Sequence, residues 1–333
     1  MGIEKIRVSI GSAQKLGLTE KKIQDMVTTC YLMTYIPAKC MANCGFCPQS
    51  RSSKSSLDKL SRISWPIFPL KEVLTKLKYL LPSKKFKRIC IQTLNYPENF
   101  NDLIELVPKL KESTSSPISA AIPPMEKEQL RRLKSVGTER VAISLDAATP
   151  SIFKEIKGEG VNGPYKWEDH NDLLLKARDI FTDWKVSTHL IIGLGETQRE
   201  MVKRIEKLRK LKIIPGLFAF MPVKGTKLEN MKRPNIITFR KIQLARYLLI
   251  VQNKAIENIT FNQKGEIIHF NMNDNTLWNI IDQNEAFMTT GCPGCNRPYY
   301  TSSPLGPVYN FPRKLTKREK EEIYNQLKSY IKL

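Results

Sequence analysis

Three cysteines fall within eight residues of the 333-residue sequence, in the segment Cys40-Met-Ala-Asn-Cys44-Gly-Phe-Cys47. The segment comes directly after Cys30–Pro37, an apolar run with the composition of a buried β-strand. Three thiolates on one loop can converge on one soft metal centre. A [4Fe–4S] cluster normally takes four thiolates, so three would leave one iron open for a small ligand. Zinc is the alternative, but structural zinc sites take four protein ligands, and no fourth cysteine or histidine lies near this loop.

Apolar runs alternate with helical patterns along most of the chain. The runs expected to form strands are Cys30–Pro37, Arg88–Leu94, Ile118–Ile122, Arg140–Leu145, Lys185–Leu194, Gly216–Val223, Ile259–Gln263 and Glu285–Thr290. Helical periodicity occurs at Leu70–Leu80, Glu126–Val136, Trp167–Ile180, Thr197–Leu211 and Phe239–Val251. About eight alternations predict an α/β fold, a complete or near-complete eight-stranded TIM-type (β/α) barrel, with a doubly wound open sheet as the alternative.

The barrel is expected to occupy residues 29–305. An N-terminal helical extension is expected at residues 1–28 and a C-terminal helical tail at residues 306–333. No apolar run approaches the roughly 18 residues that a membrane-spanning helix needs. The start of the chain, MGIEKIRVSIG, lacks the apolar region of a secretion signal. We therefore expect a cytoplasmic protein with no membrane partner.

The cysteines and the charge each leave two interpretations open. An odd number of cysteines, seven, favours metal or redox chemistry over disulfides in a cytosolic chain. The formal net charge is +22, from 54 Lys and Arg against 32 Asp and Glu. Such a surface attracts polyanions or acidic proteins, or it only maintains solubility. The basic segments that stand out are Lys84–Arg88, Lys203–Lys212 and Arg51–Lys54, the last of them beside the cysteine loop.

The CxxxCxxC spacing, with Phe46 before the last cysteine, resembles the signature of the radical S-adenosylmethionine (SAM) superfamily. The resemblance implies a [4Fe–4S] cluster on Cys40, Cys44 and Cys47, with SAM bound at the open iron. It further implies that a reducing electron donor is a partner, because electron transfer cleaves SAM to methionine and a 5′-deoxyadenosyl radical. In the family this radical abstracts hydrogen from an unactivated C–H bond.

The resemblance also implies SAM contacts at the ends of the expected strands. Asn95 follows the second strand, where the family binds the SAM amino group. Ser144 and Asp146 end the fourth strand, where relatives hold the ribose, and a carboxylate can accept hydrogen bonds from both ribose hydroxyls. Capping of a helix is the alternative role for Asp146. The full set of implied SAM-binding residues is Phe46, Asn95, Ser144, Asp146, Lys166 (near the SAM carboxylate) and Ile192 (against the adenine).

Within the superfamily, Cys47-Pro48-Gln49-Ser50 and Pro222–Thr226 resemble stretches of biotin synthase. That enzyme holds a [2Fe–2S] cluster inside its barrel with three cysteines and an arginine. Cys90 matches the first of those positions, but the third and fifth expected strands contain no cysteine. The departure argues against a biotin-type cluster, and Cys90 is interpreted as a small buried hydrophobic residue.

A second cysteine group lies near the C-terminus. The segment Cys292-Pro-Gly-Cys295-Asn-Arg297-Pro-Tyr-Tyr resembles the C-terminal motif of two-component lipoyl synthases, which consist of two paralogous radical SAM proteins. Cys30 is the remaining thiol. If strands one and eight are neighbours in a closed barrel, Cys30, Cys292 and Cys295 supply three ligands for a second, auxiliary [4Fe–4S] cluster. A redox pair or half of a zinc site is the alternative for Cys292 and Cys295.

The resemblance implies sulfur insertion into an octanoyl chain on a carrier-protein lysine, with sulfur taken from the auxiliary cluster. An unactivated methylene is too weakly acidic for acid–base catalysis, so cofactors must carry this step. The implied partners are an acidic lipoyl carrier domain, steered in by a basic rim, and a paralogous radical SAM subunit. The alternatives are a biotin synthase-like sulfurtransferase on a small molecule and an RNA-modifying radical SAM enzyme. We find no RNA-binding motif, so a nucleic-acid partner is not expected.

Overall fold

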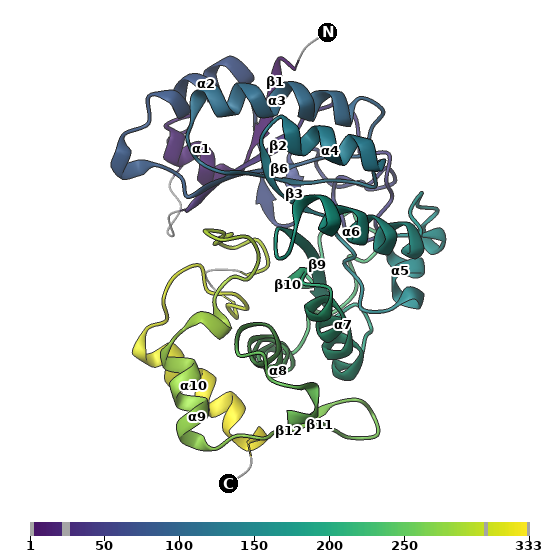
Figure 1. The fold of residues 1–333 in the computed structure, drawn as a ribbon, viewed down its shortest axis with the longest axis vertical. Coiled ribbons are helices and arrows are strands. Elements are labelled where there is room, and N and C mark those ends of the chain that lie inside the picture. The colour runs from purple at the N-terminus through teal and green to yellow at the C-terminus, as the bar shows by residue number, and fades with distance from the viewer. Residues whose placement is uncertain (1–2, 22–26, 303–305, 332–333) are drawn as a thin grey trace.

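The computed structural model of the protein describes residues 3–21, 27–302 and 306–331. Its centre is an eight-stranded sheet with the strand order β10-β9-β8-β7-β6-β2-β1-β5 (Figure 1). Six neighbouring strands are parallel, and β1 (Lys5–Val8) and β5 (Ile67–Pro69) add an antiparallel edge. The parallel strands are β2 (Thr29–Thr34), β6 (Arg88–Gln92), β7 (Ile118–Ala121), β8 (Thr138–Ala142), β9 (Val186–Ile192) and β10 (Ile214–Ala219).

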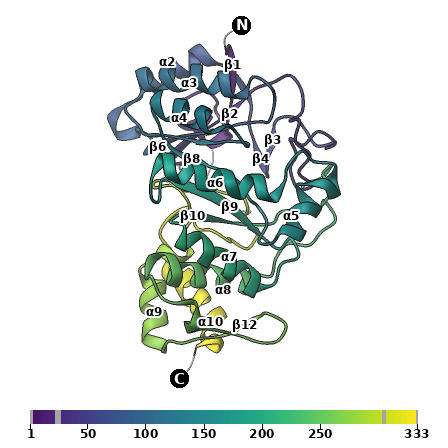
Figure 2. The ribbon, with the colours of Figure 1, turned by 45° about the vertical axis from the view of Figure 1, so that its right-hand side comes forward.

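Helices lie on the outer side of the sheet, as right-handed crossovers between parallel strands require. Figure 2 shows α6 and α7 along β9 and β10, and α8 to α10 gathered at the C-terminal end. Each helix turns an apolar stripe to the strands; α7 buries Met201, Val202, Ile205 and Leu208. The helices between the strands are α2 (Leu70–Lys78), α3 (Asn99–Ser113), α4 (Lys127–Ser135), α5 (Pro150–Ile156), α6 (Trp167–Phe181) and α7 (Gln198–Lys210), and α8 (Ile236–Arg246) follows β10.

The expected closed, eight-stranded barrel is not confirmed, because the strands form an open, curved partial barrel, which we call the barrel. In the described residues the sheet is open, with β10 at one end and β5 at the other. The expected seventh strand, Ile259–Gln263, instead pairs antiparallel as β11 (Ile259–Phe261) with β12 (Ile267–Phe270) in a separate hairpin. A local turn explains the difference, because Gly265 adopts a positive φ of 77° and lets the chain reverse there.

The expected eighth strand, Glu285–Thr290, is a short 3₁₀ helix at Glu285–Phe287 followed by irregular chain. Thr290 nevertheless lies where a neighbour of β10 would be. Its hydroxyl oxygen accepts a hydrogen bond from Leu217 N–H at 2.8 Å, and Asn310 Nδ2 donates to Leu217 O at 3.1 Å. Side chains therefore satisfy backbone groups on the free edge of β10, so the edge does not need a further strand there.

In the described part of residues 1–28, the expected helical extension contains one helix, α1 (Ile10–Leu16). Lys5–Val8 joins the main sheet as β1, because Ile6 and Val8 bury their side chains as a strand pairing with β2. Residues 22–26 lie outside the described part of the chain. In the C-terminal segment, α10 (Lys317–Leu327) packs against α9 (Asp274–Asp282) and α8. Residues that precede α10 return to the open side of the sheet (Figure 1).

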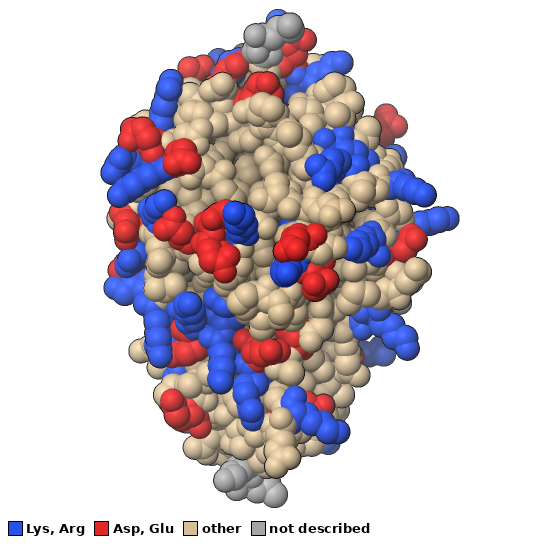
Figure 3. Space-filling model, turned by 90° about the vertical axis from the view of Figure 1, so that its right-hand side faces the viewer, with Lys and Arg blue, Asp and Glu red and all other residues tan. Residues whose placement is uncertain are grey.

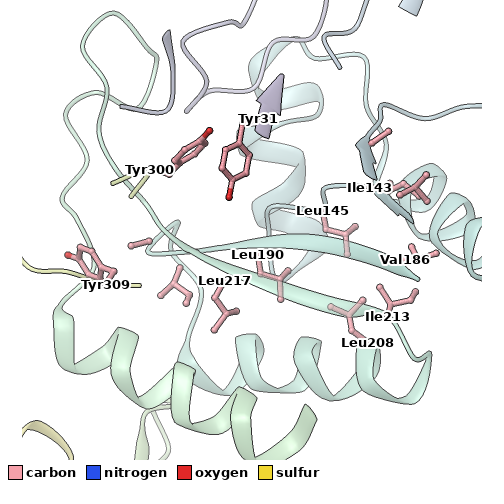
Figure 4. Close-up of a cluster of buried hydrophobic side chains, with 14 of the residues drawn as sticks. Tyr31, Ile143, Leu145, Val186, Leu190, Leu208, Ile213, Leu217, Tyr300 and Tyr309 are labelled. Carbon is pink, nitrogen blue, oxygen red and sulfur yellow. The ribbon is translucent and has the colours of Figure 1, made fainter. Parts of the chain in front are cut away.

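Two groups of apolar side chains occupy opposite faces of the parallel strands. Figure 4 shows Leu190 and Leu217 directed toward the outer helices, whereas Tyr31 and Tyr300 face one another inside the curved sheet. The two tyrosine ring centroids are 5.4 Å apart. None of the helices in the described ranges combines the length and the apolar character that crossing a bilayer requires.

Arg240 on α8 anchors the returning C-terminal segment. Its guanidinium donates hydrogen bonds to the carbonyls of Val308 and Tyr309 and to Gln243 Oε1, at 2.5 to 2.6 Å. The residue is 3% exposed, and burial lowers the pKa of its guanidinium to about 9.

We expect Arg240→Met to lower the free energy of unfolding by about 3 kcal/mol, because buried carbonyls lose a charged donor. The measurement is urea denaturation of the iron-free protein. Arg131→Met is the matched control, since Arg131 pairs with Glu128 on the surface and its loss should cost no more than about 0.5 kcal/mol. Equal losses in the two variants would contradict the anchoring role.

Candidate active site

A cavity of about 290 Å³ lies inside the curved sheet. Its walls are largely apolar, and six of the seven cysteines line it: the loop trio Cys40, Cys44 and Cys47, with Cys90, Cys292 and Cys295 beyond them. The loop trio follows the carboxyl end of β2. The second trio lies near the amino ends of the strands. The cavity therefore has thiols at both of its ends.

The cysteine loop is held in place by backbone hydrogen bonds. Asn95 N–H donates to Cys40 Sγ at 3.1 Å, and Met41 N–H donates to Asn95 O at 2.8 Å. Gly45 N–H donates to the Ile156 carbonyl at 2.7 Å, which ties the loop to the end of α5. The loop is thus fixed to the ends of β6 and α5 by hydrogen bonds within the chain.

Burial raises the pKa of all three loop thiols. The pKa of Cys47 rises to about 12, and the pKa values of Cys40 and Cys44 are also raised by burial. The ammonium group of Lys157 acts in the opposite direction and lowers each of them. The thiols stay protonated until a metal replaces their protons, and metal binding is then coupled to proton release.

Four of the six expected SAM-binding residues line this cavity: Phe46, Asn95, Ser144 and Asp146. Ile192 lies on the opposite face of β9, in the main core, because side chains alternate along a strand and Ser187, His189 and Ile191 point inward. Lys166 is exposed at the start of α6, and it does not line the cavity. Ile191 and Lys157 therefore line the cavity, whereas Ile192 and Lys166 lie outside it.

Asp146 forms a buried ion pair with Lys157, with 2.7 Å between Oδ2 and Nζ. Their side chains are only 9% and 6% exposed. The Lys157 ammonium also donates to the Ser144 carbonyl, so it joins two of the expected SAM contacts. Asp146 does not cap α5, because Thr149 occupies that cap and accepts from Ile152 N–H.

The sequence did not indicate that Lys157 belongs to the site. Lys157 lies at the end of α5, far from any recognisable motif, and only the packing of α5 beside β8 brings it to Asp146. Tyr165, another lining residue, escaped prediction for the same reason.

His189 and Ser144 connect two neighbouring strands, with 2.8 Å between Nδ1 and the serine oxygen. Burial, together with the nearby guanidinium of Arg297, lowers the pKa of His189 to about 4. The imidazole is consequently neutral at physiological pH. A neutral ring in this place supplies a hydrogen-bonding wall to the cavity without adding charge.

The second thiol trio consists of Cys90 on β6 and Cys292 and Cys295 on the loop after the 3₁₀ helix. Burial, together with the nearby Cys292 and Cys295 thiols, raises the pKa of Cys90 to about 12, so the three groups are close enough to interact. Hydrogen bonds from the Thr28 and Thr29 hydroxyls to Gly294 O, at 2.6 and 2.9 Å, fix the loop to the start of β2. The loop thus enters the amino end of the barrel, opposite to the expected catalytic face.

Cys30 does not join this trio. It is fully buried on the outer face of β2, where its thiol contacts Ser12 of α1, whereas Tyr31 and Met33 point into the cavity. The structure therefore separates Cys30 from Cys292 and Cys295, although all three were expected together.

The donor chemistry of both trios fits iron–sulfur clusters. Within the described residues, no three Cys, His, Asp or Glu side chains come as close together as the ligands of a single metal ion do. Each thiolate of a four-iron cluster binds a different iron, so cluster ligands are spaced more widely than zinc ligands. Thiolates alone, without carboxylates or histidines, are also the ligands that such clusters prefer.

The basic segments do not form one continuous surface patch. Arg88 is buried and forms an ion pair with Glu139 at 2.7 Å, so it does not belong to a surface patch. Arg51 is exposed beside the cysteine loop and donates to Asn162 O. Figure 3 shows basic side chains spread over one whole face with acidic ones between them. This face has no continuous basic surface of the kind that the net charge suggests.

Residues 34–208 match the Radical SAM superfamily, and this region contains the cysteine loop and the strands around it. It covers just over half of the chain, so the protein belongs to the Radical SAM superfamily. Membership implies a [4Fe–4S] cluster and SAM as cofactors, and the Cys40, Cys44 and Cys47 loop fits that cluster.

Biotin synthases are among the similar proteins. The one from Clostridium acetobutylicum is 25% identical over 221 residues, covering 65% of this chain and 63% of that protein. The one from Methanococcus aeolicus is 23% identical over 214 residues, covering 63% and 61%. The chain thus spans a little less than two thirds of these relatives. A third, from Clostridium perfringens, is 26% identical over 245 residues and covers 68% and 72%.

Solved structures support the fold. Methylornithine synthase (PylB) superposes with a TM-score of 0.51 at 15% identity, covering 71% of this chain and 68% of that one. The FeFe-hydrogenase maturase HydG from Carboxydothermus hydrogenoformans superposes with a TM-score of 0.53 at 17% identity, covering 74% and 57%. At such identities the likeness concerns the fold alone.

We expect Lys157→Met to lower the free energy of unfolding by about 3 kcal/mol, because the Asp146 carboxylate is left buried without its partner. The double variant Lys157→Met with Asp146→Asn should recover much of the loss. Urea denaturation of the iron-free protein provides the values. Lys154→Met is the control, since Lys154 pairs with Glu159 at the surface. A double variant less stable than Lys157→Met alone would count against the ion pair.

His170 generates a prediction about pH. It is 2% exposed between the rings of Phe153 and Tyr165, and burial lowers its pKa to about 3. In the unfolded chain a histidine has a pKa near 6.5, so the unfolded state binds a proton at pH 5 that the folded state does not. This contribution to stability is present above pH 6.5 and is lost as the pH falls toward 3.

Between pH 7 and pH 5, the unfolding free energy of the unmodified protein should therefore fall by about 2 kcal/mol more than that of His170→Asn. Urea denaturation of both proteins at the two pH values tests the difference. Asparagine keeps a side-chain N–H for the Lys166 carbonyl, which the ring Nδ1 contacts at 3.1 Å. Equal falls in the unfolding free energy of the two proteins would show that His170 is not buried in its neutral form.

Proposed function

We propose that this protein is a radical SAM sulfurtransferase that inserts sulfur into an octanoyl chain carried on a lysine of an acidic carrier domain, together with a paralogous radical SAM subunit. The observation that carries the proposal is the single cavity with a thiol trio at each end. A sulfur-inserting enzyme needs a radical source and a sulfur source on either side of one substrate carbon. The cytoplasm, where thiols stay reduced, is the proposed location.

The chemistry that the bound SAM cluster supplies is one-electron cleavage of SAM to methionine and a deoxyadenosyl radical, which takes a hydrogen atom from the substrate. A low-potential one-electron donor provides the electron. The net change at carbon is the replacement of C–H by C–S, with the sulfur drawn from an auxiliary iron–sulfur cluster. Each sulfur inserted uses one SAM and one hydrogen atom, which leaves as part of 5′-deoxyadenosine.

The protein's own residues position the reactants and exclude water. Asn95, Ser144 and Asp146 present polar atoms beside the cysteine loop, and Lys157 fixes the orientation of Asp146. The remaining walls are mostly apolar, with Ala120, Met221 and Val223 among them. Such walls suit a hydrocarbon chain and keep a reactive radical away from polar side chains.

A small-molecule substrate is the second candidate, because the similar proteins include biotin synthases. The absence of the strand cysteines that bind the biotin-type cluster argues against a small-molecule substrate. The register partner of Cys90 on β7 is Ser119, and β9 presents Ser187 to the cavity, so neither β7 nor β9 contributes a cysteine to the cavity wall.

We expect the anaerobic, reconstituted protein to convert an octanoylated carrier domain to a sulfur-containing product when SAM, a reductant and the paralogous subunit are present. Mass spectrometry of the carrier peptide reports the added sulfur, and 5′-deoxyadenosine reports SAM cleavage. Cys44→Ala should abolish both. Dethiobiotin in place of the carrier tests the small-molecule candidate. SAM cleavage without sulfur on any octanoyl carrier would reject the proposal.

A further inference from the structure

The amino end of the barrel contains a cysteine group that the SAM cluster does not use. Cys90, Cys292 and Cys295 all line the cavity there, and they come from two segments about 200 residues apart. Cys90 has Tyr31 of β2 and Ser119 of β7 as its register partners on the two sides. Register partners in a parallel sheet point to the same face, so this layer of side chains is directed inward.

Each of the three sulfurs has a polar group beside it. Gln92 Nε2 donates to Cys90 Sγ at 3.1 Å, and Ser187 Oγ lies 3.9 Å from Cys292 Sγ. Tyr31 OH lies 3.4 Å from Cys295 Sγ. The Tyr31 oxygen already accepts the N–H groups of Asn296 and Arg297, at 3.2 and 2.8 Å. Its single proton is therefore free to be donated to the sulfur.

Positive charge is also built into this end of the cavity. Arg88 lines the cavity and donates through Nε to the Pro293 carbonyl at 3.1 Å, between the two loop cysteines. Its Nη1 is buried and finds no hydrogen-bond partner among the described residues. Arg297 lies beside the loop and stacks on Phe218 at 3.8 Å. Buried N–H donors and cations next to thiolates stabilise the negative charge that a thiolate-bound cluster carries.

We propose that Cys90, Cys292 and Cys295 hold a second iron–sulfur cluster at the amino end of the barrel, with Tyr31, Gln92 and Arg88 as its supporting shell. The assignment rests on the proposed function, for which this cluster is the sulfur source, and it replaces Cys30 with Cys90 in the ligand set. The site faces the SAM cluster across the cavity, so a substrate carbon between them is open to the radical on one side and to sulfide on the other.

The test is iron and sulfide content of the full chain after anaerobic reconstitution. The unmodified protein should bind about eight irons, and each of Cys90→Ala, Cys292→Ala and Cys295→Ala should bind about four. Cys30→Ala is the matched control, a buried thiol on the neighbouring strand that should keep about eight. Cys44→Ala should also bind about four, in a cluster whose electron paramagnetic resonance spectrum does not respond to SAM.

The electron paramagnetic resonance spectrum also shows whether each variant is folded. The three alanine variants should retain the signal of the reduced cluster that changes when SAM is added, which requires a folded barrel. Loss of half the iron in Cys30→Ala with none lost in Cys90→Ala would overturn the assignment, as would about four irons in the unmodified protein. Halved iron in the expected variants without sulfur insertion by the unmodified enzyme would uphold the site and reject the proposed function.

Discussion

The hydroxyl group of Tyr31 joins the first parallel strand, β2, to the C-terminal loop Cys295–Arg297 inside the curved sheet. It accepts two backbone N–H groups of the Cys295–Arg297 loop and contacts the Cys295 sulfur. Tyr31 is 1% exposed, so water does not compete for these bonds, and buried hydrogen bonds of this kind specify one geometry strongly. The position of the loop, and with it the floor of the cavity, depends on this side chain.

The cavity has sulfur-bearing and charged groups at both ends, and most of its wall is apolar. At the carboxyl ends of the strands, the Asp146–Lys157 pair and the ordered cysteine loop form a preorganised, charged site. At the amino ends, the thiols, Arg88 and Arg297 form another. The groups at each end can hold a cofactor, and the apolar wall suits a hydrocarbon chain. The proposed sulfur insertion depends on both features.

The sequence predicts those parts of the fold that depend on local patterns. Each of the six parallel strands coincides with an apolar run, and the cysteine loop is recognisable from its spacing alone. The apolar run at Ile259–Gln263 was expected to join the main sheet, but the turn at Gly265 allows a local hairpin instead. The apolar content of the run does not distinguish the two outcomes. Lys157 and the inward direction of Cys90 depend on tertiary packing and on which face of a strand turns inward. The alternation of Arg88, Cys90 and Gln92 along β6 is visible in the sequence, but the choice between the two faces is not.

The open edge of β10 is completed by side chains of Thr290 and Asn310 and not by a strand. A strand ladder ties many consecutive residues to one register, whereas a few side-chain contacts leave the backbone path between them unconstrained. The superfamily match ends at residue 208, well before this segment begins. The path of this segment can therefore change while the register of the parallel strands, and the cysteine loop at their carboxyl ends, stay the same.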